Sequence, residues 1–203
     1  MQIAIVTFDG FTDIDVVLPW DLLHRAKGEG WTIRLVGTEP VHVSATGLDV
    51  RMHGAVEETH DADVVLFASG RPTRALAASP EYLARFALDP GRQMIGSMCS
   101  GALLLAALGL LDGADATTYP TARAALEAFG VTVVERPFVA NGNVATAAGC
   151  LAAQDLVGWV VERLLGPARR DLVLRSIQPV GRGLQLADAA ALEDVYAPAA
   201  ATN

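Results

Sequence analysis

The segment Gly-Ser-Met-Cys-Ser-Gly at residues 96–101 constrains the fold most, because an apolar stretch with strand character precedes it and an apolar stretch with helix character follows it. Small residues on both sides of Cys99, namely Ser97 and Gly101, permit a sharp strand-turn-helix corner where larger side chains would collide. Such a corner is a nucleophile elbow. A cysteine in the first turn of a helix lies near unpaired N–H groups that favour its thiolate. The alternative, an inert core cysteine, does not account for the small flanking residues.

Composition limits the fold and the class of partner. The 203 residues, 52% of them hydrophobic, suffice for one α/β domain with a full central sheet. A formal net charge of −8 argues against nucleic acid or an anionic membrane as partner and suits a protein that handles a small molecule. The longest apolar run, residues 101–111, is too short to cross a bilayer. The two cysteines form no disulfide framework, and the chain starts in a strand without a basic leader, so we expect a cytoplasmic protein.

Strands and helices are expected to alternate along the chain. Buried strands are predicted at residues 2–8, 31–36, 63–68, 92–97 and 131–135, and hairpins at 41–51 and 138–146. Helices are predicted at 72–78, 80–88, 100–108, 122–129, 151–165 and 168–177, and within 11–25, where Pro19 either starts the helix or kinks it. This alternation predicts a flavodoxin-like three-layer α/β sandwich, a mostly parallel central sheet with helices on both faces. We expect a catalytic domain at residues 1–180, and a tail or lid at 181–203.

Three candidate groups follow strands of the predicted sheet. Asp15 comes after the first strand, Gly70 lies in the loop after the third, and Cys99 follows the strand at 92–97. If these strands are parallel, their carboxyl ends meet at the edge where ligands bind. A carboxyl group beside a thiolate in an apolar pocket favours its neutral form, so Asp15 can donate a proton. The alternative for Asp15 is a solvated carboxylate at a helix start.

Histidine, the usual base for a cysteine nucleophile, is not expected near the elbow. The four histidines (His24, His42, His53 and His60) do not follow predicted strand ends that face it, and they have no metal-ligand spacing. We therefore expect no cysteine–histidine dyad, no metal site and no cofactor. Asp9, Asp13 and Asp21 fit capping or surface roles.

Several segments resemble one known family. The Cys-Ser-Gly elbow, Thr-Thr-Tyr-Pro at residues 117–120 and Gly-Asn-Val-Ala-Thr-Ala-Ala-Gly at 142–149 resemble the ThiJ/PfpI branch of the class I glutamine amidotransferase-like superfamily, over about residues 1–177. Asp15, leading into Pro-Trp-Asp at 19–21, is similar to the isonitrile hydratase subgroup and to sensor domains of certain transcription regulators. Most other members have a glutamate at the position of Asp15.

The sequence also departs from that family at the expected site. Arg71 stands where many relatives have a glycine, and Tyr119 where relatives have a histidine. Ser100 replaces the histidine of the protease-like members. Neither position at which relatives carry a histidine has one here. We expect the substrate pocket to differ in shape from theirs.

The resemblance implies an isonitrile hydratase-like lyase and a homodimer. Cys99 would attack the terminal carbon of an isonitrile while Asp15 delivers a proton, and water would release an N-substituted formamide from the thioimidate. Backbone N–H groups of Gly70 and Ser100 would stabilise negative charge or position water. The implied substrate-binding residues are Ile14, Arg71 and Tyr119.

Other readings stay open. The scaffold suits a glyoxalase- or hydrolase-type cysteine enzyme, for which Arg71 would favour a carboxylate-bearing substrate. A non-catalytic sensor would instead hold Cys99 as a sulfenic or sulfinic acid. A regulator's ligand-binding domain fits less well, because the chain is acidic and has no helix-turn-helix segment. We expect structural roles for Cys150 and Trp159 in the core or an interface, and for Asp155 as a buried or capping carboxylate.

Overall fold

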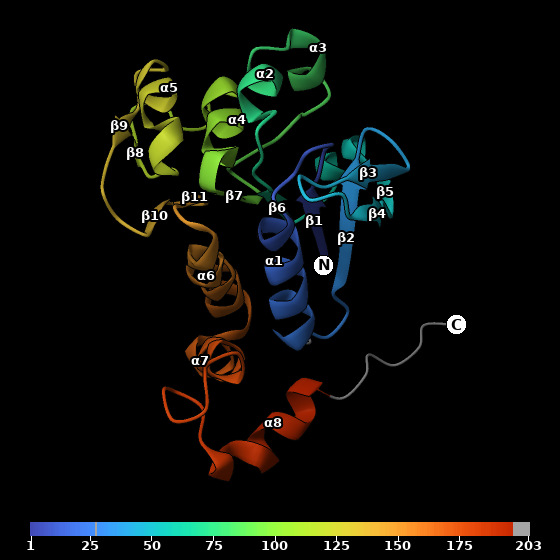
Figure 1. Cartoon of the computed structure of the whole chain (residues 1–203), viewed down its shortest axis with the longest axis vertical. Helices are drawn as coiled ribbons and strands as arrows, with labels where there is room; N and C mark the ends of the chain where they lie inside the picture. Colours follow the sequence, from blue (N-terminus) through green and yellow to red (C-terminus); the bar gives the residue numbers. More distant parts are fainter. Residues whose placement is uncertain (27, 197–203) are drawn as a thin grey trace.

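A seven-stranded sheet organises the computed structural model, which describes residues 1–26 and 28–196 (Figure 1). From one edge to the other its strands are β10 (Phe138–Asn141), β11 (Val144–Ala147), β7 (Met94–Met98), β6 (Val64–Phe67), β1 (Gln2–Val6), β2 (Thr32–Gly37) and β5 (Gly54–Ala55). All neighbours pair in parallel except β10, which is antiparallel to β11. The carboxyl ends of the five central strands therefore meet at one edge of the sheet.

The central strands are apolar because helices cover both faces of the sheet. Every residue of β6 and β7 is buried, as expected for parallel strands between two helical layers. Figure 1 shows α1 (Asp13–Ala26) and α6 (Ala153–Leu165) on one side of the sheet, with α2 (Thr73–Ala77) and α4 (Ala102–Ala107) on the other. The predicted three-layer α/β sandwich with a mostly parallel sheet is confirmed.

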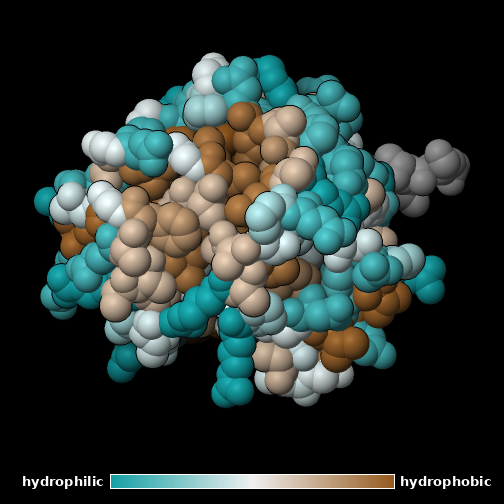
Figure 2. Space-filling model, turned by 90° about the horizontal axis from the view of Figure 1, so that it is seen from above, coloured by the Kyte–Doolittle hydropathy of each residue, from teal (hydrophilic) through white to brown (hydrophobic). Residues whose placement is uncertain are grey.

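Shorter elements complete the described chain. They are helices α3 (Pro80–Leu83), α5 (Arg123–Glu127), α7 (Pro167–Ser176) and α8 (Ala189–Tyr196), and the two-stranded pairs β3 (Val41–Val43) with β4 (Asp49–Arg51) and β8 (Asp115–Ala116) with β9 (Thr132–Val133). Short 3-10 turns are η1 (Val56–His60), η2 (Cys99–Gly101), η3 (Pro120–Ala122), η4 (Cys150–Ala152) and η5 (Leu186–Asp188). Figure 2 views the molecule from the end that carries α2 to α5, where apolar side chains form a continuous area bordered by polar ones. Within the described ranges, no helix combines the length and the apolar composition needed to span a bilayer.

The first helix differs from the expectation that it starts or kinks at Pro19. α1 starts at Asp13 and contains Pro19 in its interior. Proline has no N–H group, so the carbonyl of Asp15 four residues earlier receives no helical hydrogen bond from it. The helix nevertheless holds the side chain of Asp15 at a fixed, buried position.

The segment after residue 180 contains regular structure that the sequence pattern did not indicate. η5 and α8 lie there, and α8 packs against α7 and α1. Leu192 and Val195 of α8 are buried, which explains why the helix is held in place. The boundary between a domain at 1–180 and a tail at 181–203 stays a prediction, and residues 197–203 lie outside the described residues.

Candidate active site

The predicted elbow lies at the carboxyl end of β7. Cys99 has a φ of 48°, and it is the only residue other than glycine with positive φ in the described part of the chain. Such a conformation costs an L-residue about 1–2 kcal/mol, so the surrounding structure must enforce it. A Cβ on Gly101 would lie 2.7 Å from the carbonyl oxygen of Ala68 and 2.9 Å from that of Phe67. The turn therefore passes so close to the end of β6 that only glycine fits at position 101.

Asp15 is fully buried in the first turn of α1. The Ser69 hydroxyl donates a short hydrogen bond to its Oδ2, and the buried Oδ1 has no hydrogen-bond partner. In the described chain, no cation forms an ion pair with this carboxyl group. Burial without a cation is costly for a carboxylate unless a neighbour donates a hydrogen bond to it.

That neighbour is a pair of thiols. One carboxylate oxygen of Asp15 and the sulfur atoms of Cys99 and Cys150 all lie within 4.8 Å of one another. The two sulfur atoms are 3.9 Å apart. η4 brings the half-buried side chain of Cys150 to the elbow rather than into the central core, and its expected structural role stays a prediction.

The electrostatics of the site favour the thiol form of Cys99. Burial, followed by the charge of Asp15 and the proximity of Cys150, raises the pKa of Cys99. Burial and Asp15 likewise raise the pKa of Cys150. The direction of this pKa shift is opposite to the one expected from a helix start, because burial and the charge of Asp15 favour the thiol form. Both thiols of the cluster are therefore held in the protonated form.

A pocket of about 290 Å³ opens onto the sulfur atoms. The predicted site residues that line it, with the two cysteines, are Gly70, Arg71, Ser100 and Tyr119. Ile14 does not line this pocket; its side chain is 38% exposed on the first turn of α1. Tyr119 also borders a larger neighbouring cavity of about 600 Å³, so it stands between the two spaces.

The loop that contains Gly70 is fixed by hydroxyl groups. The Ser100 hydroxyl donates to the Gly70 carbonyl (3.3 Å), and the Gly70 N–H makes a long hydrogen bond of 3.4 Å to the same Ser100 oxygen. The Thr73 hydroxyl contacts both the Ser100 hydroxyl (3.0 Å) and the Gly70 carbonyl (2.8 Å). On the other side of the elbow, the Thr118 hydroxyl donates to the carbonyl of Cys99 at 2.9 Å. These bonds hold both walls of the pocket against the elbow.

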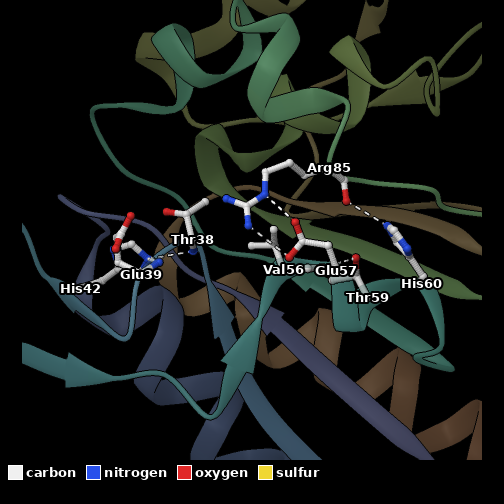
Figure 3. A network of polar contacts seen from close by, with 8 residues as sticks. All are labelled: Thr38, Glu39, His42, Val56, Glu57, Thr59, His60 and Arg85. Carbon is white, nitrogen blue, oxygen red and sulfur yellow. Dashed lines mark hydrogen bonds and ion pairs between the residues drawn. The ribbon is translucent and has the colours of Figure 1, made fainter.

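Two of the histidines belong to a polar network away from the elbow (Figure 3). The Nε2 of His42 accepts hydrogen bonds from the backbone N–H groups of Thr38 and Glu39. The Nε2 of His60 lies 2.9 Å from the carbonyl oxygen of Arg85. Both rings therefore hold loops together.

The other two histidines pack against one tryptophan. The rings of His24 and His53 lie 4.2 Å and 5.1 Å from that of Trp20. No histidine lines the pocket beside Cys99 among the residues that the structure describes. Of the predicted site residues, Asp15 is the one whose carboxyl group lies beside the thiol of Cys99. The two thiols are also ligand types that bind soft metal ions, whereas the carboxylate is a harder ligand.

The family model of the DJ-1/PfpI family matches residues 1–163. The chain belongs to the DJ-1/PfpI family. Among curated DJ-1/PfpI relatives, an isonitrile hydratase of Pseudomonas putida is 28% identical over 85% of this chain and 76% of its own length. A deglycase of Pyrococcus abyssi is 27% identical over 80% of this chain and 96% of its own. A crystal structure of a ThiJ/PfpI family protein from Pseudomonas syringae has a TM-score of 0.79 and 28% identity, covering 95% of this chain and 84% of that one.

Three residues that contact the DJ-1/PfpI site were not predicted to belong to it. Ser69 binds Asp15, Thr73 binds Ser100, and Cys150 contacts Cys99. Ser69 directly precedes Gly70 after a strand, so its position was a usable signal. The separation of Cys150 from Cys99 by 51 residues left no local signal for that contact.

Proposed function

We propose that the chain is a hydro-lyase that adds water to an isonitrile and releases an N-substituted formamide. The observation that carries this proposal is the buried pair of Cys99 and Asp15, with no histidine in the described pocket. An isonitrile carbon accepts both a nucleophile and a proton. A thiol beside a carboxyl group supplies these two together. The similarity to an isonitrile hydratase over most of the chain supports the same reaction.

In the first half of the reaction, the sulfur of Cys99 bonds to the terminal carbon of the isonitrile. Asp15 takes the thiol proton and delivers it to that carbon, which gives a thioimidate. The raised pKa of Cys99 fits this order, because the thiol keeps its proton until the carbon–sulfur bond forms. The unpaired Oδ1 of Asp15 is available to accept that proton.

In the second half, water adds to the thioimidate carbon, and a proton passes to the nitrogen. The carbon–sulfur bond then breaks, the formamide leaves, and Cys99 and Asp15 regain their shared proton. The N–H of Gly70, held only by its long bond to Ser100, is available to a developing negative charge. Arg71 and Tyr119 shape the entrance. Ile14 would contact only the part of a substrate that extends outside the pocket.

A second candidate is a glyoxalase-type reaction on an α-oxoaldehyde. Arg71 and Arg74, both of which line the pocket, favour an anionic substrate or product for such a reaction. The similarity to deglycases supports carbonyl chemistry on this scaffold.

The test is turnover of a simple aryl isonitrile by the purified protein, with the formamide detected by chromatography. We expect Cys99→Ala and Asp15→Asn each to lower kcat by about 100-fold or more. Asp13→Asn is the matched control, because this half-buried neighbour accepts hydrogen bonds from Ser44 and Thr46 instead. It should keep wild-type turnover. Wild-type protein that forms no formamide but consumes an α-oxoaldehyde would replace the first candidate by the second.

A further inference from the structure

The thiol of Cys150 has no role in the proposed reaction, yet it is the neighbour of the nucleophile. The two sulfur atoms are 3.9 Å apart, and neither is in a disulfide. A cysteine placed for packing alone has no need to face another thiol at the base of a pocket that opens to solvent. Both line the same pocket, so a small oxidant that reaches Cys99 also reaches the position from which Cys150 can respond.

The order of strands in the sheet places the two cysteines at the ends of neighbouring strands. Cys99 follows the last residue of β7 directly, and Cys150 begins η4 shortly after β11. These strands are neighbours, with Met98 paired to Ala147. Cys99 lies one residue beyond Met98 and Cys150 three residues beyond Ala147, so both cysteines follow neighbouring strands at the same edge of the sheet.

The movement that brings the two sulfur atoms together can come from the turn that contains Cys150. Bond formation requires the sulfur atoms to move from 3.9 Å to about 2 Å. Cys99 is buried within the enforced turn of the elbow, whereas Cys150 is half-buried. Gly149 before it has a φ of +88° with no atom within 4 Å of the position of a Cβ, and Leu151 after it is 66% exposed. The turn of Cys150 therefore has space to shift.

We propose that Cys99 and Cys150 form a reversible disulfide when a hydroperoxide oxidises the site, with Cys99 as the attacked and Cys150 as the resolving cysteine. This inference depends only on the two thiols and does not rest on the proposed hydration of isonitriles. It assigns Cys150 a chemical function.

The chemistry balances in two steps. The sulfur of Cys99 attacks one oxygen of the hydroperoxide, the O–O bond breaks, and an alcohol or water leaves with the thiol proton passed through Asp15. Cys99 is then a sulfenic acid. The sulfur of Cys150 attacks it, the S–O bond breaks, and water leaves with the proton of Cys150. One hydroperoxide is reduced, two thiols are oxidised, and a dithiol reductant restores them.

The experiment treats the purified full chain with a small excess of hydrogen peroxide and measures the intact mass, followed by peptide mapping without reduction. The wild-type protein should lose two hydrogen atoms in mass, yield a peptide joined through residues 99 and 150, and recover both thiols with dithiothreitol. Cys150→Ser and Cys150→Ala should instead gain two or three oxygen atoms on Cys99, and dithiothreitol should not reverse this change. Circular dichroism confirms that each variant is folded.

Leu151→Ala is the matched control, because it alters the same turn and keeps both cysteines. It should form the disulfide as the wild type does. The proposal is overturned if the wild-type protein gains oxygen atoms as the Cys150 variants do, or if the only linked product joins two chains. These readouts do not involve isonitrile, so failure of the proposed reaction leaves them unaffected.

Discussion

The carboxyl group of Asp15 lies beside two thiols at a buried site. In the described structure, no cation forms an ion pair with this carboxylate or with either sulfur atom. The Ser69 hydroxyl satisfies one carboxylate oxygen, and the other is buried without a partner. At short range, two negative charges in a buried site repel strongly. Asp15 therefore adds to the effect of burial in raising the pKa of Cys99, and its contribution can be measured without a substrate.

Asp15→Asn should lower the pKa of Cys99, because it removes the negative charge that opposes the thiolate. Each unit of decrease makes the thiolate about tenfold more abundant at a pH below both values. The pH profile of Cys99 alkylation by iodoacetamide, followed by peptide mass, should therefore move to lower pH and give a faster rate at about pH 8. Asp13→Asn should leave the profile in place. An unchanged profile in Asp15→Asn would show that burial alone sets the pKa.

The local sequence around Asp15 and Cys99 made both residues predictable. Gly101 and Ser97 mark the corner, and Asp15 lies in the first turn of the helix that follows the first strand. The contacts of Cys150 and Ser69 could not be predicted in this way, because they join segments that are 51 and 54 residues apart. Such contacts depend on the order of strands in the sheet, which the sequence pattern does not specify.

At the scale of the element, the elbow depends on the fit between η2 and the end of β6. The close carbonyl oxygens of Phe67 and Ala68 belong to the sheet and cannot move aside as a flexible side chain can. The position of Cys99 is therefore coupled to the packing of two neighbouring strands.

Gly101→Ala should destabilise the protein by about 1–3 kcal/mol, because its Cβ would overlap backbone oxygen atoms. The shifted turn should also change the rate of Cys99 alkylation. Chemical denaturation and alkylation measure the two effects. Gly158→Ala is the control, because its nearest contact is a methyl group of Leu174 at 3.1 Å and alanine favours the helix. Equal stability loss in both variants would contradict the proposed clash.

The spacing of apolar residues predicted the positions of the helices and strands better than it predicted their lengths. The helix expected at residues 80–88 ends at Leu83, although Tyr82 and Phe86 are buried as its pattern requires. Their rings pack on each other at 5.2 Å, and Phe86 also packs on Phe67 at the same distance. The apolar periodicity therefore indicates which side chains reach the core. Such side chains can follow the helical spacing even after the helix has ended.

For the whole molecule, the described part of the segment after residue 180 acts as a brace distant from the pocket. α8 contacts α7 and α1, and none of its residues lines the pocket of Cys99. A lid role has no support from this position. The homodimer implied by the family resemblance stays a prediction.

Val195→Ala should lower the free energy of unfolding by about 2 kcal/mol, because the side chain is 3% exposed. Leu186→Ala, at a side chain that is 84% exposed, should change it by less than about 0.5 kcal/mol. Neither should alter the alkylation rate of Cys99. Thermal unfolding and alkylation together check this, and slower or faster alkylation in Val195→Ala would connect α8 to the site.

The order of strands also has a consequence for the newly synthesised chain. β7 emerges from the ribosome well before β11, although the two are neighbours in the finished sheet. Until β11 arrives, Cys99 lacks part of the enclosure that suppresses ionisation of its thiol. In a nascent chain the Cys99 thiol therefore lacks part of the burial that raises its pKa, and completion of the sheet lowers its thiolate fraction.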